Sequence, residues 1–94
     1  MFCVYVLRSK KNGAKYVGYT NNLKRRLSEH NQGKNFSTMG RGPFELIYAE
    51  AYLNSKDAWA REKFLKSGWG KNYLERVLKN YWFQSKKLGG KSSK

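Results

Sequence analysis

Hydrophobic and polar residues alternate in two short segments near the N-terminus, and this alternation predicts two β-strands. The first strand is expected over Phe2–Arg8 and the second over Tyr16–Thr20. The turn segment Lys10–Gly13 separates them and ends in Asn-Gly, a dipeptide typical of hairpins. In the first strand the two faces carry Phe2, Val4 and Val6 on one side and Cys3, Tyr5 and Leu7 on the other. Gly18 in the second strand either weakens packing or allows a group to approach the backbone closely.

A helix follows this hairpin and is expected to run to about Gln32, with Gly33 as its C-terminal stop. Leu23 and Leu27 form its inward stripe. Three residues are candidates for its N-cap, namely Thr20, Asn21 and Asn22. The glycine-rich segment 33–43 is predicted to be a long loop.

The second half of the chain contains one more strand and two more helices in this prediction. Phe44–Tyr52 has a mixed apolar pattern that suits the middle strand of a small sheet. A second helix is expected to be capped by Ser55 and to end at Gly68, and a third to run from Tyr73 to about Phe83. The order β-β-α-β-α-α predicts an α+β domain over residues 1–83, followed by a basic, flexible tail over 84–94.

The apolar segments and the single cysteine limit where the protein is expected to work. The run Phe2–Leu7 is far shorter than the roughly 20 residues of a membrane-spanning helix, so no membrane association is expected. Cys3 has no cysteine partner within the chain, which fits a reducing, cytoplasmic setting. Its simplest interpretation is a small hydrophobic packing residue.

Charge changes the picture from a generic small domain to a protein that binds a polyanion. The 94 residues include twenty Lys and Arg and six Asp and Glu, which gives a net charge of +14. Nucleic acid is the leading partner, with anionic lipid and an acidic ribosomal surface as alternatives. A structural role on RNA is compatible with the charge, although the sequence contains no RNA-binding motif that we recognise.

Two residues that can bind phosphate lie beside the apolar stripe of the first helix. Arg26 and His30 are one turn apart and close to Leu23 and Leu27 on a helical wheel. Taken alone, His30 is most simply a helix-terminal histidine stabilised by the helix dipole. Arg26 at this spacing favours a phosphate site instead. Arg25 and Glu29 form a more outward i, i+4 pair on the same helix.

Glu62 is the acidic residue best suited to bind a divalent metal. It lies at the edge of the inward stripe that Ala58 and Leu65 define on the second helix. The alternative is an ordinary ion pair with Lys66 at i+4. A single carboxylate leaves water and substrate phosphate to complete a magnesium shell.

Tyr5 and Tyr16 are each most simply packing residues of a small sheet. Tyr16 and Gly18 share a strand face, so the glycine is expected to leave space near the Tyr16 hydroxyl. A phenol has a pKa near 10, and neighbouring cations would be needed for it to act as a base. Arg26, His30 and a metal ion are candidates for such neighbours.

These residues together resemble the GIY-YIG nuclease domain. The matching segments are Cys3-Val4-Tyr5, ten intervening residues, Tyr16-Val17-Gly18, then Asn22-Leu23-Lys24-Arg25-Arg26-Leu27 with His30, and Ala60-Arg61-Glu62-Lys63-Phe64-Leu65-Lys66-Ser67-Gly68. The resemblance covers residues 1–83 and is greatest to the small stand-alone bacterial members, which are similar to the N-terminal domain of the bacterial excinuclease. It implies a small central three-stranded antiparallel sheet flanked by helices.

The resemblance also implies a role for each matching residue in DNA hydrolysis with one Mg²⁺ or Mn²⁺ ion. Tyr16 resembles the tyrosine that activates water, and Tyr5 the phenol that helps to hold it. Arg26 resembles the arginine that stabilises the transition state. His30 occupies a position where relatives carry His or Tyr, and Glu62 resembles the metal ligand.

The sequence departs from the family pattern at a few positions. Cys3 and Val4 replace Gly and Ile in the first motif, and Val17 replaces Ile in the second. Tyr19 stands where some relatives have a basic residue. Asn72 and Asn80 are imperfect matches to the asparagine that some members use.

The first functional hypothesis is therefore a metal-dependent endonuclease that recognises DNA structure rather than sequence, with branched or flapped DNA as a candidate substrate. The alternative is a nucleic-acid-binding GIY-YIG module with little or no turnover. Nothing in the sequence indicates a protein partner. Seven basic residues are the expected DNA contacts: Lys15, Lys24, Arg25, Arg41, Lys63, Lys66 and Lys71.

Overall fold

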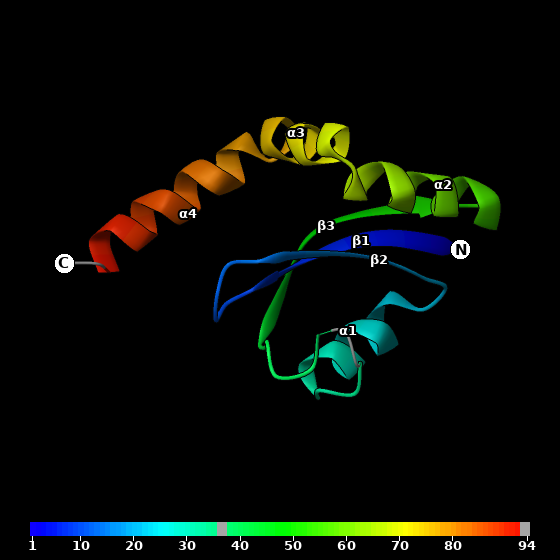
Figure 1. The fold of residues 1–94 in the computed structure, drawn as a ribbon, viewed down its shortest axis with the longest axis horizontal. Coiled ribbons are helices and arrows are strands. Elements are labelled where there is room, and N and C mark those ends of the chain that lie inside the picture. The colour runs from blue at the N-terminus through cyan, green and yellow to red at the C-terminus, as the bar shows by residue number, and fades with distance from the viewer. Residues whose placement is uncertain (36–37, 93–94) are drawn as a thin grey trace. The chain divides into compact units, whose positions relative to one another are not determined.

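The computed structural model describes the backbone of residues 1–35 and 38–92 and the side chains of 1–35 and 38–85. Across this part of the chain, three strands and four helices follow in the order β-β-α-β-α-α-α. The residues divide into two compact units, Met1–Lys63 and Phe64–Lys94. The predicted α+β class with a three-stranded antiparallel sheet is confirmed, with one helix more than the sequence suggests (Figure 1).

The sheet has β1 (Phe2–Ser9) in its centre, between β2 (Lys15–Thr20) and β3 (Phe44–Tyr52). Both neighbours run antiparallel to β1. The sequence suggests that the Phe44–Tyr52 strand is the middle one, and this prediction is wrong. Four consecutive residues of β1, from Val4 to Leu7, are buried, as expected for a strand covered on both faces. In β3 most residues are partly or fully exposed, as an edge strand allows.

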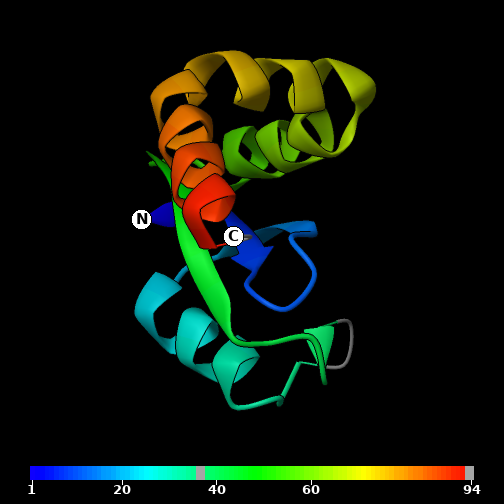
Figure 2. The same ribbon diagram turned by 90° about the vertical axis from the view of Figure 1, so that its left-hand side faces the viewer.

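The pairing of β1 and β2 decides which side chains share a face. Tyr5 lies opposite Gly18, and Leu7 lies opposite Tyr16. Because opposite residues in an antiparallel pair point to the same side, this face carries both motif tyrosines. The helix α1 (Leu23–Asn31) covers it, and its leucines pack on a core of Tyr5, Leu7 and Phe44. Figure 2 shows the helix α1 lying along this side of the sheet. The predicted faces of the first strand and the inward stripe of the helix are confirmed by the strand pairing and the packing of Leu23 and Leu27.

Local capping fixes both ends of α1. The Asn22 side chain accepts a hydrogen bond from the backbone nitrogen of Arg25 at 3.1 Å, so Asn22 is the N-cap among the three predicted candidates. At the other end the backbone nitrogen of Gly33 donates to the carbonyl of His30 at 3.2 Å. Gly33 has φ of +74°, a left-handed conformation that glycine adopts readily, and the predicted stop is confirmed.

The ends of the next helices differ from the prediction by a few residues. In α2 (Ser55–Lys66) the capping side chain is that of Asn54, which accepts from the backbone nitrogen of Lys56 at 2.8 Å, and not that of Ser55. Ser67 then caps α3 (Gly68–Val77) by accepting from the backbone nitrogen of Gly70 at 3.2 Å. Gly68 therefore begins a helix and does not merely end one.

The predicted third helix is in fact two helices, α3 and α4 (Lys79–Ser92). The break lies at Leu78, whose backbone nitrogen donates to the Leu74 carbonyl at 3.1 Å as the C-cap. The indole nitrogen of Trp82 donates to the same carbonyl at 3.2 Å. The helix α4 includes residues 84–92, for which the sequence predicts a basic tail. In the described part of the chain, no helix is both long enough and apolar enough to cross a bilayer.

The sheet face opposite to α1 carries a polar cluster centred on Glu50. Its carboxylate accepts hydrogen bonds from the hydroxyls of Tyr48 and Tyr52 and from two guanidinium nitrogens of Arg61, at 2.9 and 3.0 Å. Burial would raise the pKa of Glu50, but the hydrogen bonds from Arg61, Tyr48 and Tyr52 outweigh it and lower the pKa. This cluster attaches α2 to β3 and so positions the residue next to Arg61, which is Glu62.

The close contact of Tyr5 with Gly18 predicts that a larger residue at position 18 destabilises the fold. A Cβ atom built on Gly18 would overlap the Tyr5 phenol and lie 2.8 Å from its Cε2 atom. Because the Tyr5 ring is itself packed against α1, we expect Gly18→Ala to lower the free energy of unfolding by about 1–3 kcal/mol. Urea denaturation measures this change. Combining it with Tyr5→Leu, which removes the ring, should recover part of the loss, whereas strictly additive effects would contradict a direct clash.

Candidate active site

A buried hydrogen bond between Tyr5 and His30 forms the centre of the candidate site. The Tyr5 hydroxyl on β1 lies 2.9 Å from Nε2 of His30, which comes from the last turn of α1. Tyr5 is 3% exposed and His30 is 5% exposed. The phenol and the imidazole also meet edge to face, with ring centroids 5.9 Å apart. The structure thus brings together two predicted site residues that are 25 positions apart in the sequence.

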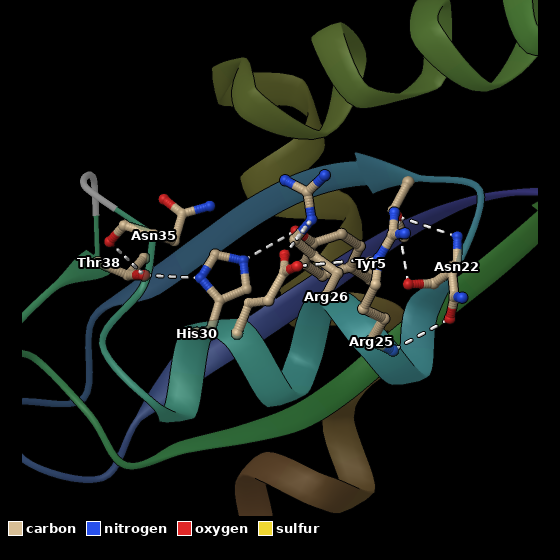
Figure 3. A network of polar contacts seen from close by, with 9 residues as sticks. Tyr5, Asn22, Arg25, Arg26, His30, Asn35 and Thr38 are labelled. Atoms are coloured by element: carbon tan, nitrogen blue, oxygen red, sulfur yellow. Dashed lines mark hydrogen bonds and ion pairs between the residues drawn. The ribbon is translucent and has the colours of Figure 1, made fainter.

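The second nitrogen of His30 contacts a residue that the sequence analysis did not identify. Its Nδ1 atom lies 2.6 Å from the hydroxyl of Thr38, which is 1% exposed (Figure 3). The Thr38 hydroxyl lies 3.5 Å from the carbonyl oxygen of Asn35, to which it donates. Thr38 is a short polar residue in a loop, and its burial depends on the folded arrangement around α1. No periodicity or motif in the sequence marks it.

Arg26 lies one turn before His30 on α1, and its guanidinium lies close to the tyrosine–histidine pair (Figure 3). Its Nε atom is 3.4 Å from the carboxylate of Glu29. The predicted ion pair of Arg25 with Glu29 is also present, at 3.8 Å, so the Glu29 carboxylate pairs with two arginines. The side chain of Arg26 is 33% exposed, which leaves part of its guanidinium accessible to a phosphate.

Burial and the charge of Arg26 determine the protonation states of the pair. Burial lowers the pKa of His30, and the nearby positive charge of Arg26 lowers it further, so the imidazole is neutral at neutral pH. Burial raises the pKa of Tyr5 and outweighs the opposing effect of Arg26. The charges of Glu62 and Glu29 raise it further. Tyr5 is therefore a neutral phenol that can donate a hydrogen bond.

Glu62 lies on α2, partly exposed, and its charge acts on Tyr5. Among the residues that the structure describes, no three His, Cys, Asp or Glu side chains form a group able to hold a metal ion. This arrangement does not fit a metal held entirely by protein ligands. It fits Mg²⁺ anchored by one carboxylate, because that ion usually keeps several water ligands and binds substrate phosphate.

Tyr16 lies on the same sheet face as Tyr5 but in a different environment. It is partly exposed, and its ring meets Phe44 edge to face with centroids 5.5 Å apart. Its hydroxyl accepts a long hydrogen bond, 3.5 Å, from the guanidinium of Arg41. Gly18 does not leave open space beside Tyr16, because the ring of Tyr5 lies there. The close approach of this ring confirms the other expected role of Gly18, which is to let a group approach the backbone.

The loop that carries Arg41 is attached to the hairpin by several hydrogen bonds. Ser9, which is buried, donates from its hydroxyl to the Arg41 carbonyl at 2.6 Å. The backbone nitrogen of Lys10 donates to the Pro43 carbonyl at 2.9 Å, and the Lys11 ammonium donates to the Gly40 carbonyl at 3.3 Å. The same hairpin that supplies Tyr5 and Tyr16 thus holds the loop in place.

The predicted DNA contacts are distributed over both units. In the first unit Lys24, Arg25, Arg41 and Lys63 are exposed and Lys15 is partly exposed, and in the second unit Lys66 and Lys71 are exposed. The Lys63 ammonium lies 3.6 Å from the centroid of the Trp59 ring, a cation–π contact.

Comparison with known proteins assigns the chain to a family. The model of the GIY-YIG catalytic domain matches residues 1–86, nearly the whole chain. The chain belongs to the GIY-YIG family. The resemblance recognised from the two motifs, Arg26 and Glu62 is therefore confirmed. GIY-YIG domains are nuclease domains and generally use divalent metals, and DNA is the substrate that membership suggests.

Similar GIY-YIG proteins are small bacterial chains. A UPF0213 protein of Bacillus licheniformis is 37% identical over 87 residues, which are 92% of this chain and 82% of the relative. A UPF0213 protein of Oceanobacillus iheyensis is 44% identical over 64 residues, which are 67% of this chain and 73% of the relative. The solution NMR structure of a UPF0213 protein from Bacillus halodurans is similar, with a TM-score of 0.52 and 36% identity, covering 82% of this chain and 85% of that one.

Proposed function

We propose that this protein is a metal-dependent endonuclease that hydrolyses phosphodiester bonds in DNA and recognises DNA structure rather than sequence. The observation that carries the proposal is the buried hydrogen bond of Tyr5 to a neutral His30, next to the charge of Arg26. This combination places a polarised phenol and a phosphate-binding cation in one site. Both are chemically suited to attack on a phosphodiester.

Arg26 is proposed to stabilise the transition state. Its Nε atom is buried and makes no hydrogen bond, although it lies near the Glu29 carboxylate. A guanidinium only donates hydrogen bonds, and it fits phosphate oxygens in pairs. We therefore assign its accessible part to the non-bridging oxygens, on which negative charge increases during the reaction.

The two tyrosines have different proposed roles because their surroundings differ. Tyr16 is partly exposed and lies beside the cationic Arg41, so it can reach the water that attacks the phosphate. We assign Tyr16 as the general base. Tyr5 is buried and hydrogen-bonded to His30, and we assign its hydroxyl to hold or orient that water.

Glu62 is proposed to bind one Mg²⁺ or Mn²⁺ ion. Its charge affects the phenol of Tyr5, which supports a location close to the reacting groups. A bound divalent cation would supply Lewis-acid stabilisation of the phosphate and of the leaving oxygen. The protein contributes the carboxylate, and it holds Tyr5 and Arg26 in fixed positions beside this charge.

The basic surface supports DNA binding without sequence recognition. A net charge of +14 favours contacts to the phosphate backbone, which carry no direct sequence information. The same charge also favours the alternative function, a binding module with little or no turnover. Net charge therefore supports both hypotheses equally, and the chemistry of the site supports the nuclease.

The test is cleavage of labelled branched, flapped, nicked and linear DNA of equal length, each with Mg²⁺, Mn²⁺ or EDTA. We expect metal-dependent cleavage that is faster on one of the non-linear substrates. Binding that weakens steeply with salt, without cleavage of any substrate in either metal, would favour the binding module. Equal rates on all substrates would contradict recognition of DNA structure.

A further inference from the structure

Thr38 is buried, polar and in contact with the site, yet the proposed reaction gives it no role. It lies in the loop after α1 and is among the most completely buried residues of the described chain. Its hydroxyl contacts Nδ1 of His30, the imidazole nitrogen that faces away from Tyr5 (Figure 3). A buried hydroxyl needs hydrogen-bond partners, and a buried neutral imidazole needs both a donor and an acceptor.

The direction of each hydrogen bond follows from the donors available. Figure 3 shows the Arg26 guanidinium beside Tyr5 and His30. Because a guanidinium only donates hydrogen bonds and is positively charged, it favours the orientation in which the lone pairs of the Tyr5 oxygen are directed toward Arg26 and the Tyr5 proton toward His30. Nε2 of His30 is then the acceptor. In a neutral imidazole the proton must therefore lie on Nδ1, 2.6 Å from the Thr38 hydroxyl.

Thr38 completes this series of hydrogen bonds because its hydroxyl can accept one hydrogen bond and donate another. Its oxygen accepts from Nδ1, and its own proton points to the carbonyl oxygen of Asn35, 3.5 Å away. The backbone nitrogen of Thr38 also donates to this carbonyl, at 3.1 Å. Every proton from Tyr5 to Asn35 thus has one donor and one acceptor.

We propose that Thr38 is a positioning residue that keeps the proton of His30 on Nδ1, so that Nε2 stays free to accept from the Tyr5 hydroxyl. A histidine in water carries its neutral-state proton mainly on Nε2, and the hydrogen bond at one nitrogen determines which nitrogen is protonated. With the proton on Nε2, His30 would donate to Tyr5 and would no longer polarise its O–H bond. The catalytic consequence rests on the proposed nuclease function, whereas the tautomer does not.

The test uses the fact that His30 is the only histidine in the chain, so its imidazole nitrogen signals can be assigned without ambiguity. Nitrogen-15 NMR of the full-length protein at neutral pH should show His30 mainly protonated on Nδ1. A majority with the proton on Nε2 in the unmodified protein would overturn the proposal, whether or not any variant folds.

Two matched variants separate the hydroxyl from the shape of the side chain. Thr38→Val keeps the branched shape and removes the hydroxyl, whereas Thr38→Ser keeps the hydroxyl. We expect Thr38→Val to move the His30 proton toward Nε2, and Thr38→Ser to retain the Nδ1 form. An unchanged tautomer in Thr38→Val, with the fold intact by circular dichroism, would show that Thr38 only fills space.

Cleavage kinetics give the catalytic consequence. Single-turnover cleavage by Thr38→Val should be about tenfold slower than by the unmodified protein, with DNA affinity unchanged and most of the rate recovered in Thr38→Ser. A normal rate in a variant with the altered tautomer would overturn the positioning role. If even the unmodified protein does not cleave DNA, the proposed function fails, while the NMR result still decides what Thr38 does to His30.

The pH dependence of the His30 signals offers a second readout. The charged groups that act on this imidazole are Arg26 and Glu29 of α1, and the polar groups in contact are Tyr5 and Thr38, with the Phe44 ring against it from β3. We expect the pKa of His30 in the unmodified protein to lie below the ordinary value of about 6.5. Titration at or above that value would contradict the buried, neutral imidazole on which the tautomer depends.

Discussion

Replacing Arg26 with glutamine should slow DNA cleavage by about 10²–10³-fold, the loss typical of removing one transition-state donor. Glutamine retains a polar side chain of moderate length but removes the charge near Tyr5 and His30. DNA affinity should change little, because the chain retains most of its positive charge. Single-turnover cleavage and equilibrium binding, measured on the same labelled DNA, separate these two effects.

Arg25→Gln is the matched control for this experiment. Arg25 is the adjacent residue on α1, pairs with the same carboxylate of Glu29, and has a side chain that is 58% exposed. It differs from Arg26 in pointing outward and not toward the tyrosine–histidine pair. Because Arg25 is also an expected DNA contact, its variant is compared at saturating protein, where Arg25→Gln should leave the cleavage step nearly unchanged. Equal losses in the two variants would show that Arg26 acts only through general charge.

Glu62→Gln should reduce metal-dependent cleavage by at least about 10²-fold while DNA binding persists. The amide has almost the same shape as the carboxylate but lacks the negative charge that binds a divalent cation. The metal dependence of the Glu62→Gln variant should also change, and a much higher Mg²⁺ or Mn²⁺ concentration should be needed for half-maximal cleavage. A metal titration of the single-turnover rate measures both effects.

Asp57→Asn supplies the control on the same helix. It removes the same amount of charge from the first turn of α2, where Asp57 acts on the helix dipole. We expect a small loss of stability and an ordinary metal dependence. If Asp57→Asn and Glu62→Gln required the same raised metal concentration, the acidic contribution would be diffuse and Glu62 would not be the ligand.

The parts of the site that the sequence predicts are those that local structure determines. Strand alternation places Tyr5 with Leu7 on one face of the first strand and Tyr16 with Gly18 on one face of the second, because strand side chains alternate regardless of what packs against them. The observed register then brings both tyrosines to the same side of the sheet. The helical period places Arg26 and His30 together in the same way. Asn22 and Gly33 fix the ends of α1 through hydrogen bonds a few residues apart.

The parts that the sequence does not predict depend on contacts between distant segments. Thr38 contributes to the site because it is buried beside His30, and neither its residue type nor its spacing in the sequence indicates this contact. The pattern of β3 suggests a middle strand, but its pairing with β1 alone makes it an edge strand. Gly18 is predicted to open space, but a ring from the neighbouring strand fills it.

The helix boundaries in the second unit show the same limit on a smaller scale. Leu74, Val77, Leu78 and Tyr81 have helical spacing across the break at Leu78, so the periodicity does not reveal it. The break is visible only in the cap, where the Leu74 carbonyl accepts from both Leu78 and Trp82. Gly70, in the first turn of α3, lies so close to the backbone of Leu65 that a Cβ atom would overlap it, which explains why a glycine is needed at this position.

The most direct test of the central claim is the single-turnover cleavage of one labelled flapped duplex by the unmodified protein and by identically purified Glu62→Gln. Both would be measured with Mg²⁺, with Mn²⁺ and with EDTA. The nuclease account predicts cleavage by the unmodified protein in metal only, and a loss of at least about 10²-fold in Glu62→Gln at equal DNA binding. Cleavage at the same rate by both proteins, or no cleavage by the unmodified protein in either metal, would contradict it.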